Sequence, residues 1–283
     1  MNLRYNLLLL ILCSVFFSCN SKKKEIVIIP DYQKNHLQRN RIFGNVKEMT
    51  TTVYLKEIID SMEILTKLSS LTQHYSADGF LLKIVSCNPL DRIVSIKTID
   101  YLSNAKEKSW IETDSLGNLL SRCDYEYDMN GYIVSEKHYD HDSVSFYIDF
   151  ETDGVGNVIS MNRHFTDFSL YNKIYYNDKG LVVKSEEYDP DHKLFKYADM
   201  EYDNYGDEVN RRVFQAPKKL IEYTYTQYDD QGNLIKVTYE DRLHHLKEER
   251  FYSNHDKDKN WMEEEQHKIN GQILVRKRAF IYY

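Results

Sequence analysis

Proline, tryptophan and cysteine are scarce in this chain, which has 4, 2 and 4 of them among 283 residues. Two of the cysteines, Cys13 and Cys19, lie in an apolar N-terminal segment, so only Cys87 and Cys123 remain elsewhere. A small scaffold held together by several disulfides is therefore excluded. Cys87 and Cys123 form either one disulfide or two buried free thiols, and neither has a spacing typical of metal ligands.

Basic charge is also in short supply. The 37 Lys and Arg residues are outnumbered by 44 Asp and Glu residues, which gives a net charge of −7. Nucleic-acid binding is disfavoured, because the phosphate backbone requires a basic face. The sequence lacks G-x-S-x-G, H-E-x-x-H and Walker patterns, and its many carboxylates single out no acid–base pair. We therefore expect no catalytic residue, no cofactor and no enzymatic activity.

The N-terminal segment has the pattern of an export signal. Its apolar run of about eleven residues, Leu7–Phe17, suits the core of a signal peptide and is too short for a stable membrane-spanning helix. Ser18 directly before Cys19 resembles a bacterial lipobox, although two phenylalanines stand where leucine and a small residue are usual. We predict a lipoprotein signal peptide over residues 1–18 and lipid attachment at Cys19. An ordinary secretory signal is the alternative.

Residues 19–43 are predicted to tether the following domain, residues 44–283, to a membrane. The tether begins with the polar stretch Asn20–Glu25, whose three lysines suit a solvated linker near a membrane surface. It lacks the acidic run that is associated with surface export in some lipoproteins. We therefore expect a lipid-anchored protein of the bacterial cell envelope, facing the periplasm rather than the cell surface.

A nine-residue pattern, seen as YDDQGNLIK at Tyr228–Lys236, recurs along the chain. Asp or Asn stands three residues before the glycine in six of seven copies, and Tyr stands one residue earlier in five. The third residue after the glycine is always apolar and the fourth is always polar. Weaker copies at Asn88 and Asp256 lack the glycine. The aligned glycines are Gly79, Gly117, Gly131, Gly156, Gly180, Gly206 and Gly232.

The residues at these aligned positions of the repeat are typical of a hairpin turn. An Asx side chain bonds the backbone two residues on and starts the turn, and glycine takes positive φ without a Cβ penalty. The apolar–polar step then indicates the start of a half-buried strand. Tyrosine favours pleated sheet surfaces, which suits the 24 tyrosines. The seven glycines are therefore predicted to be structural turn residues rather than parts of a ligand loop.

Looser breaks lie between the repeated turns, so the chain is predicted to turn about every 13 residues from Gly79 to Gly271. The strands between them are about 8–9 residues, or about 28 Å, long. Upstream, Gly44–Leu55 alternates like a strand, and Glu57–Leu71 is predicted as turn plus strand, with a short helix as the alternative. The fold class is all-β, a long antiparallel meander of repeated hairpins.

The size of this meander limits its shape. About eighteen strands at 4.8 Å spacing form a flat ribbon roughly 85 Å wide, and a sheet of that size must coil or close. We predict a coiled, partly open sheet. A closed barrel and two packed layers are the alternatives.

The repeats, as they stand in YDDQGNL, YDMNGYI, TDGVGNV and YDNYGDEV, resemble the YD repeat of the RHS family. The resemblance covers residues 46–283, and with the lipobox it is similar to the pattern of uncharacterised bacterial RHS-repeat lipoproteins. It implies a spiralling sheet that serves as a shell around a toxin or as an adhesive surface. This chain departs from the toxin type, because no distinct domain follows the repeats and it is too short to enclose a folded cargo.

The repeats favour binding over catalysis. A repeat protein presents an extended face, so we expect a protein partner, with specificity at the turns that vary. The alternative is a glycan that stacks on exposed tyrosines, Trp110 or Trp261. Metal-capable groups at His138–Asp142 and Asp189–His192 fall at predicted turns, where such side chains are solvated, so no metal site is expected.

Overall fold

The computed structural model describes Leu37 and residues 41–283; the predicted signal peptide, Cys19 and most of the tether lie outside these residues. Within them, no helix is long and apolar enough to cross a bilayer. From Val46 onward the regular elements are all strands. They are β1 Val46–Ile59, β2 Met62–Tyr75, β3 Leu81–Cys87, β4 Ile93–Tyr101, β5 Glu107–Asp114, β6 Leu119–Tyr127, β7 Ile133–Asp140, β8 Ser143–Thr152, β9 Val158–His164, β10 Ser169–Tyr176, β11 Val182–Tyr188, β12 Leu194–Tyr202, β13 Glu208–Gln215, β14 Lys219–Tyr228, β15 Leu234–Asp241, β16 Leu246–Ser253, β17 Glu263–Lys268 and β18 Ile273–Tyr282.

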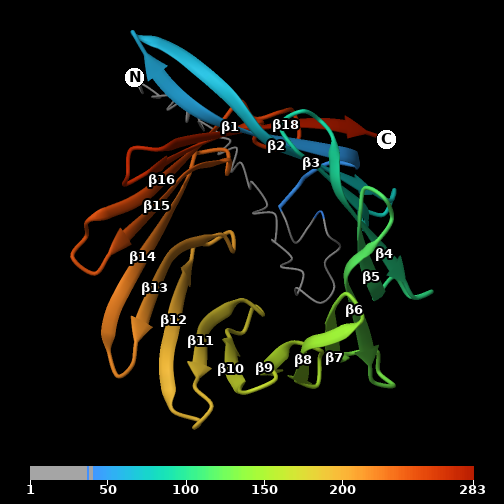
Figure 1. The fold of residues 1–283 in the computed structure, drawn as a ribbon. Helices are drawn as coiled ribbons and strands as arrows, with labels where there is room; N and C mark the ends of the chain where they lie inside the picture. Colours follow the sequence, from blue (N-terminus) through green and yellow to red (C-terminus); the bar gives the residue numbers. More distant parts are fainter. Residues whose placement is uncertain (1–36, 38–40) are drawn as a thin grey trace, which may run out of the picture.

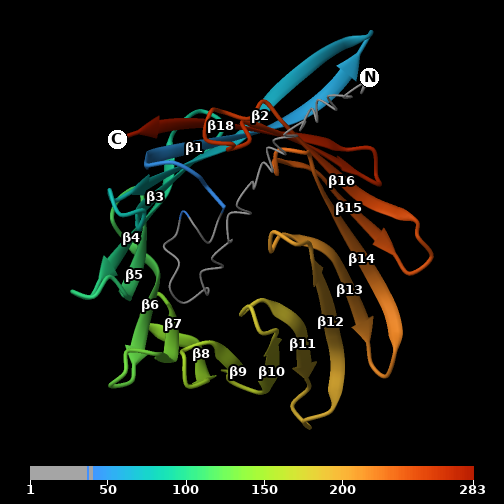
Figure 2. The same cartoon turned by 180° about the vertical axis from the view of Figure 1, so that it is seen from behind.

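These strands form a closed barrel. Each strand pairs antiparallel with its neighbours in sequence, and the last strand pairs with the first, as Figures 1 and 2 show from opposite sides. The closing register runs from Val46 opposite Tyr282 to Lys56 opposite Ile273. The antiparallel meander is therefore confirmed, whereas the predicted open, coiled sheet is wrong.

A repeated β-bulge gives the physical reason for closure. Between β12 and β13, Glu201 opposes Asn210 and Tyr202 opposes Glu208, so Val209 is an extra residue without a partner in the register. A bulge bends its strand and increases its twist. Since the bulges recur at equivalent positions, the curvature adds up until the two sheet edges meet. The same apolar column of the repeat supplies the extra residue at Leu82, Leu120, Val134, Ile159, Val183 and Ile235.

One Asx side chain organises each repeated turn except the one at Gly79, where Ser76 takes its place. In the turn between β14 and β15, Oδ1 of Asp229 accepts hydrogen bonds from the backbone N–H groups of Gln231 at 2.9 Å and Asn233 at 2.8 Å. The Gly232 N–H donates to the Asp229 carbonyl at 2.9 Å. All seven aligned glycines have positive φ. At Gly156 a Cβ would also lie only 2.5 Å from the ring of Tyr132, so this position excludes larger residues for two reasons.

Several looser turns adopt the same geometry without glycine. In the turn between β15 and β16, Asp241 accepts from the N–H groups of Leu243 and His245, and His244 takes the glycine position with a φ of 60°. A non-glycine residue is strained there. The other residues in this position with positive φ are Asp91, Ala105, His192 and Lys259.

The turns gather into two rims, because successive strands run in opposite directions. The rim that we call the repeat rim carries the turns after β2, β4, β6, β8, β10, β12, β14 and β16, including six of the seven aligned glycines. The other, the variable rim, carries the turns after β1, β3, β5, β7, β9, β11, β13, β15 and β17, with Gly117 in the turn after β5. Gly117 is therefore the single aligned glycine that lies outside the repeat rim.

The tyrosine column ties neighbouring strands together along the repeat rim. The Tyr202 hydroxyl, at the end of β12, donates to the Val182 carbonyl at the start of β11, with an oxygen–oxygen distance of 2.7 Å. This bond joins strands that the local turn does not connect. The same bond recurs from Tyr101 to Leu81, Tyr127 to Glu107, Tyr176 to Val158 and Tyr228 to Glu208.

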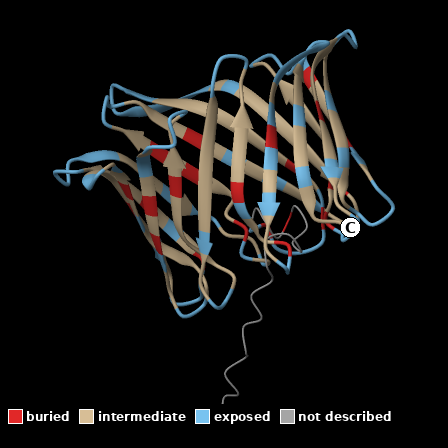
Figure 3. Cartoon of the chain, turned by 90° about the horizontal axis from the view of Figure 1, so that it is seen from below, coloured by how far each residue is buried: buried red, intermediate tan, exposed pale blue. Residues whose placement is uncertain are grey.

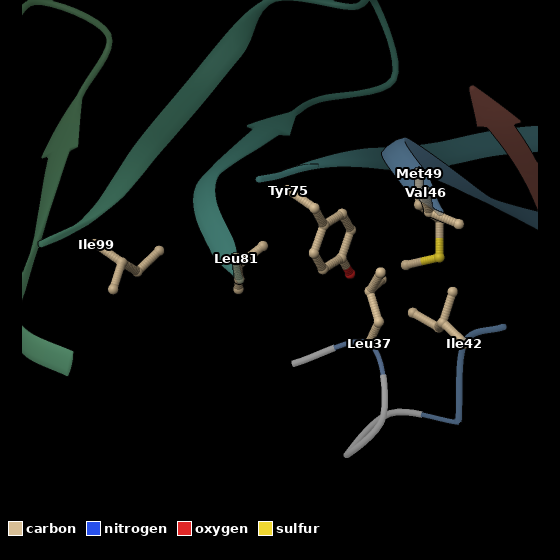
Figure 4. Packing of buried hydrophobic residues seen from close by; sticks show 7 residues of the cluster. All are labelled: Leu37, Ile42, Val46, Met49, Tyr75, Leu81 and Ile99. Atoms are coloured by element: carbon tan, nitrogen blue, oxygen red, sulfur yellow. The ribbon is translucent and has the colours of Figure 1, made fainter. Parts of the chain in front are cut away.

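Residues 41–45, which directly precede β1, lie on the interior side of the ring and identify the inner face of the wall (Figures 1 and 2). Leu37 and Ile42 pack there against Met49, Tyr75 and Leu81, and Figure 4 shows these side chains converging. Most other wall residues are only half-buried, because the barrel is a single layer with two faces (Figure 3). Eighteen strands at about 4.8 Å spacing give a diameter of about 27 Å, which wall side chains do not fill.

Candidate functional site

The hairpin of β1 and β2 projects beyond the rest of the ring (Figures 1 and 2). Both strands have 14 residues, and they are joined at Asp60 and Ser61, which both have positive φ, as in a tight two-residue turn. The strand predicted in the Glu57–Leu71 region is thus present, and no helix forms there. β18 accompanies β1 only as far as Lys56.

The projecting part of the hairpin leaves one strand edge without a neighbour. β2 pairs with β1 from Met62 to His74 but with β3 only from Ser70 to Tyr75. Among the described residues, Met62–Ser69 is therefore hydrogen-bonded to a strand on one side only. Such an edge offers backbone N–H and C=O groups to another extended chain.

Exposed apolar side chains lie on the hairpin and on the turns that follow it around the rim in both directions. Ile58 and Met62, next to the tip, are each 64% exposed. The adjacent turns of the variable rim, after β3, β5, β15 and β17, add Leu90, Leu116, Leu243 and Ile269, all largely exposed. We call these six residues the apolar rim. They occupy one continuous arc, because those hairpins are neighbours around the closed ring.

Acidic groups are interleaved with the apolar side chains of the hairpin. Glu57, Asp60 and Glu63 are exposed at the tip. Lys56 carries ion pairs to Glu63 at 2.8 Å and to Glu265 at 3.1 Å, and the hydrogen bond that it donates to Glu63 is the main cause of its raised pKa. The hairpin therefore offers an acidic as well as an apolar surface.

A second group of functional side chains lies on the inner wall. The register places Ile99, Trp110, Cys123, His138 and Phe146 in one row across β4 to β8. Ile99 belongs to the cluster around Leu37, so the whole row faces the interior.

Within this row, Cys123 and His138 lie directly opposite each other, and Glu136 is two residues before His138 on the same face. The His138 Nε2 atom is 3.7 Å from the Cys123 sulfur and 3.1 Å from a Glu136 oxygen. Burial, reinforced by the Glu136 carboxylate, raises the pKa of the Cys123 thiol to about 12. Across Leu37 and residues 41–283, these three residues form the one group of three or more His, Cys, Asp or Glu side chains with metal-ligand spacing.

Of the residues singled out in the sequence, some lie where they were expected and others do not. His138 belongs to β7 and faces inward, so its expected place at a solvated turn is wrong. Asp189 and His192 do lie at an exposed turn, where Asp189 accepts from the Lys193 N–H. Cys87 and Cys123 are free thiols, because β3 presents Cys87 on the outer face.

Both tryptophans have a cation over the ring. The Lys97 ammonium lies 3.5 Å from the Trp110 centroid, and the Arg278 guanidinium lies 3.4 Å from that of Trp261. Burial lowers the pKa of Arg278 to about 10. These cations cover ring faces that a sugar would need for stacking.

The chain matches no protein-family model and no curated protein. Solved structures do resemble its fold. A porin-like protein from Bacteroides uniformis is 10% identical, with a TM-score of 0.44 and coverage of 84% of this chain and 98% of that one. A LolA superfamily protein from Nitrosomonas europaea is 6% identical, with a TM-score of 0.24 and coverage of 83% and 84%. A putative outer membrane lipoprotein-sorting protein domain from Vibrio parahaemolyticus is 8% identical, with a TM-score of 0.27 and coverage of 86% and 89%.

The predicted kinship with the RHS family is wrong. No family model supports it. The wall is a closed ring of eighteen strands instead of the spiral that this resemblance implied. The repeated Y-D-x-x-G turn is a local solution for joining two strands, and a local turn does not determine a family.

Proposed function

We propose that this chain is a lipid-anchored cell-envelope protein that binds a partner protein and catalyses no reaction. The observation that carries the proposal is the projecting β1–β2 hairpin, with its one-sided edge at Met62–Ser69 and its apolar surroundings. A partner with an extended segment can add a strand to this edge, while its side chains cover Ile58, Met62 and the rest of the apolar rim. Exposed apolar patches of this kind mark interaction sites.

Charge favours a protein over a bilayer as the occupant. Glu57, Asp60 and Glu63 at the tip are repelled by anionic headgroups, whereas a partner with basic residues around its extended segment is attracted. The proposed anchor at Cys19 and the proposed envelope location rest on the N-terminal sequence.

Site-specific photocrosslinking in cells tests the docking surface. A photoreactive amino acid at Met62 is expected to give one defined protein adduct, and the same group at Asp191, on the polar part of the variable rim, is the matched control. The double variant Ile58→Glu with Leu65→Glu should remove the adduct and leave the thermal midpoint nearly unchanged, because both side chains are exposed. Equal adducts at positions 62 and 191, or an adduct that survives the double variant, would contradict the proposal.

The anchor has its own test. The unchanged protein should incorporate a palmitate analogue in growing cells, and the Cys19→Ala variant should not. Labelling that persists in Cys19→Ala would show that the lipid is attached elsewhere or that the label is nonspecific.

A further inference from the structure

We propose that Cys123, Glu136 and His138 bind a zinc ion on the inner wall of the barrel. This site is independent of the docking hairpin, because it lies on β6 and β7, whereas the hairpin consists of β1 and β2. It is absent from the sequence prediction, which treated the two thiols and the histidine separately.

The distances fit the ion. The three donor atoms lie within 4.8 Å of one another, with 3.7 Å between sulfur and nitrogen and 3.1 Å between nitrogen and oxygen. Around a tetrahedral zinc with bonds of about 2.0–2.3 Å, neighbouring donors are about 3.3–3.6 Å apart. The sulfur–nitrogen and nitrogen–oxygen distances lie within about 0.2 Å of this range, and a movement of the flexible Glu136 side chain by up to about 1.2 Å brings the sulfur–oxygen pair into it.

The donor set is also right for zinc. A thiolate, an imidazole and a carboxylate are its usual protein ligands, and three of them leave the fourth position for water. When zinc binds, the sulfur–hydrogen bond of Cys123 is replaced by a zinc–sulfur bond, and the proton is released to solvent. No change of oxidation state is involved.

The surroundings hold the ligands in place. The His138 ring stacks on Phe146, with centroids 4.1 Å apart, and meets Trp110 edge-on at 6.1 Å. This aromatic contact on both sides fixes the plane of the imidazole. Ordered ligands bind metal more tightly than mobile ones.

Metal titration of the full-length protein tests the site. The protein is purified in detergent with a reductant, stripped of metal and titrated with zinc chloride, and its bound metal is measured by mass spectrometry after dialysis. We expect one ion per chain, and at least a 10-fold weaker affinity in Cys123→Ser and His138→Gln. Cobalt(II) in place of zinc should show the charge-transfer band of a thiolate ligand, and this band should be absent in Cys123→Ser.

Matched controls separate the site from the other thiol and from surface histidines. Cys87→Ser removes the outer thiol, and His164→Gln removes an outer-face histidine that pairs with Asp149 at 3.0 Å. Both should bind zinc as the unchanged protein does, and zinc should raise their thermal midpoints but not that of Cys123→Ser. Should Cys123→Ser fail to fold, the near-isosteric Glu136→Gln takes its place. Less than one ion per chain, a cobalt complex without the thiolate band, or undiminished binding in the ligand variants would overturn the proposal.

Discussion

Single aspartates define the turns, and their ionisation links the turns to pH. The Asn233 backbone N–H, with the Asn233 side chain, stabilises the charged form of Asp229 and lowers the pKa of that carboxyl below its usual range. A carboxyl whose pKa is lowered in the folded state stabilises the fold above its unfolded pKa, and this contribution is lost as the pH falls through the folded value. The pKa values of Asp114 and Asp241 are lowered in the same way.

Asp229→Asn should therefore lower the thermal midpoint near pH 7 by a few degrees. The amide keeps one acceptor oxygen but loses the second, to which the Asn233 side chain donates at 2.7 Å. The difference from the unchanged protein should begin to shrink as the pH falls below the unfolded pKa of about 4, and it should be lost as the pH passes the lowered pKa of folded Asp229. Melting curves between pH 2 and 7 measure this, with the exposed neighbour Asp230→Asn as the control for charge alone. A difference that stays constant with pH would contradict the role given to the carboxylate.

The sequence predicted the Asx contacts, since they follow from the chemistry of one side chain and the backbone beside it. It did not reveal that Ala105, His192 and His244 would occupy the glycine position of the same turn. Those residues tolerate positive φ poorly on their own, and the strand pairing on either side of the turn overrides this local preference.

At the scale of the strand, the bulge decides which side chains share a face. Counting outward from the opposed pair Tyr127 and Ile133, regular pairing would place Cys123 opposite Lys137. The extra residue Val134 shifts the register by one, and Cys123 opposes His138 instead. A shift of one residue exchanges the two faces of a strand. The inner cluster could not be predicted, because the apolar column was interpreted as the start of a regular strand.

Deleting Val209 should abolish the native fold. Without this bulge residue, β13 must either lose its turn geometry or present Val213 to the outer face, where its contact with Ala198 is lost. Val209→Ala keeps the residue count and should cost about 1 kcal/mol or less. Near-UV circular dichroism and urea unfolding compare the two variants. A deletion variant with native spectra and an unchanged urea midpoint would show that the bulge does not determine the register.

At the scale of the whole molecule, closure joins the two ends of the chain. β1 and β18 are the most distant strands in sequence, yet they pair along their length. The sequence around Thr50 or Ala279 does not indicate that these two residues pair, because a threonine or an alanine suits many positions on the outer face of a strand. The number and kind of strands were predictable from turn spacing, but the sum of their curvature was not.

A disulfide between β1 and β18, across the seam where the ring closes, tests closure directly. Thr50 and Ala279 are directly paired, so cysteines there fall within the reach of a disulfide. In a Cys87→Ser background, Thr50→Cys with Ala279→Cys should oxidise almost completely and migrate faster on a non-reducing gel. Thr50→Cys with Thr238→Cys, which joins β1 to the distant β15, should stay reduced. Little oxidation of the seam pair, or equal oxidation of both pairs, would show an open sheet.

The seam between β1 and β18 also has a consequence for biogenesis. The first strand emerges from the ribosome, and under the predicted export route from the membrane, long before its closing partner exists. Until β18 arrives, the nascent sheet has two unpaired margins, and both invite pairing with other chains. The ring therefore closes only once β18 has been made, and a chain truncated before β18 keeps both margins open.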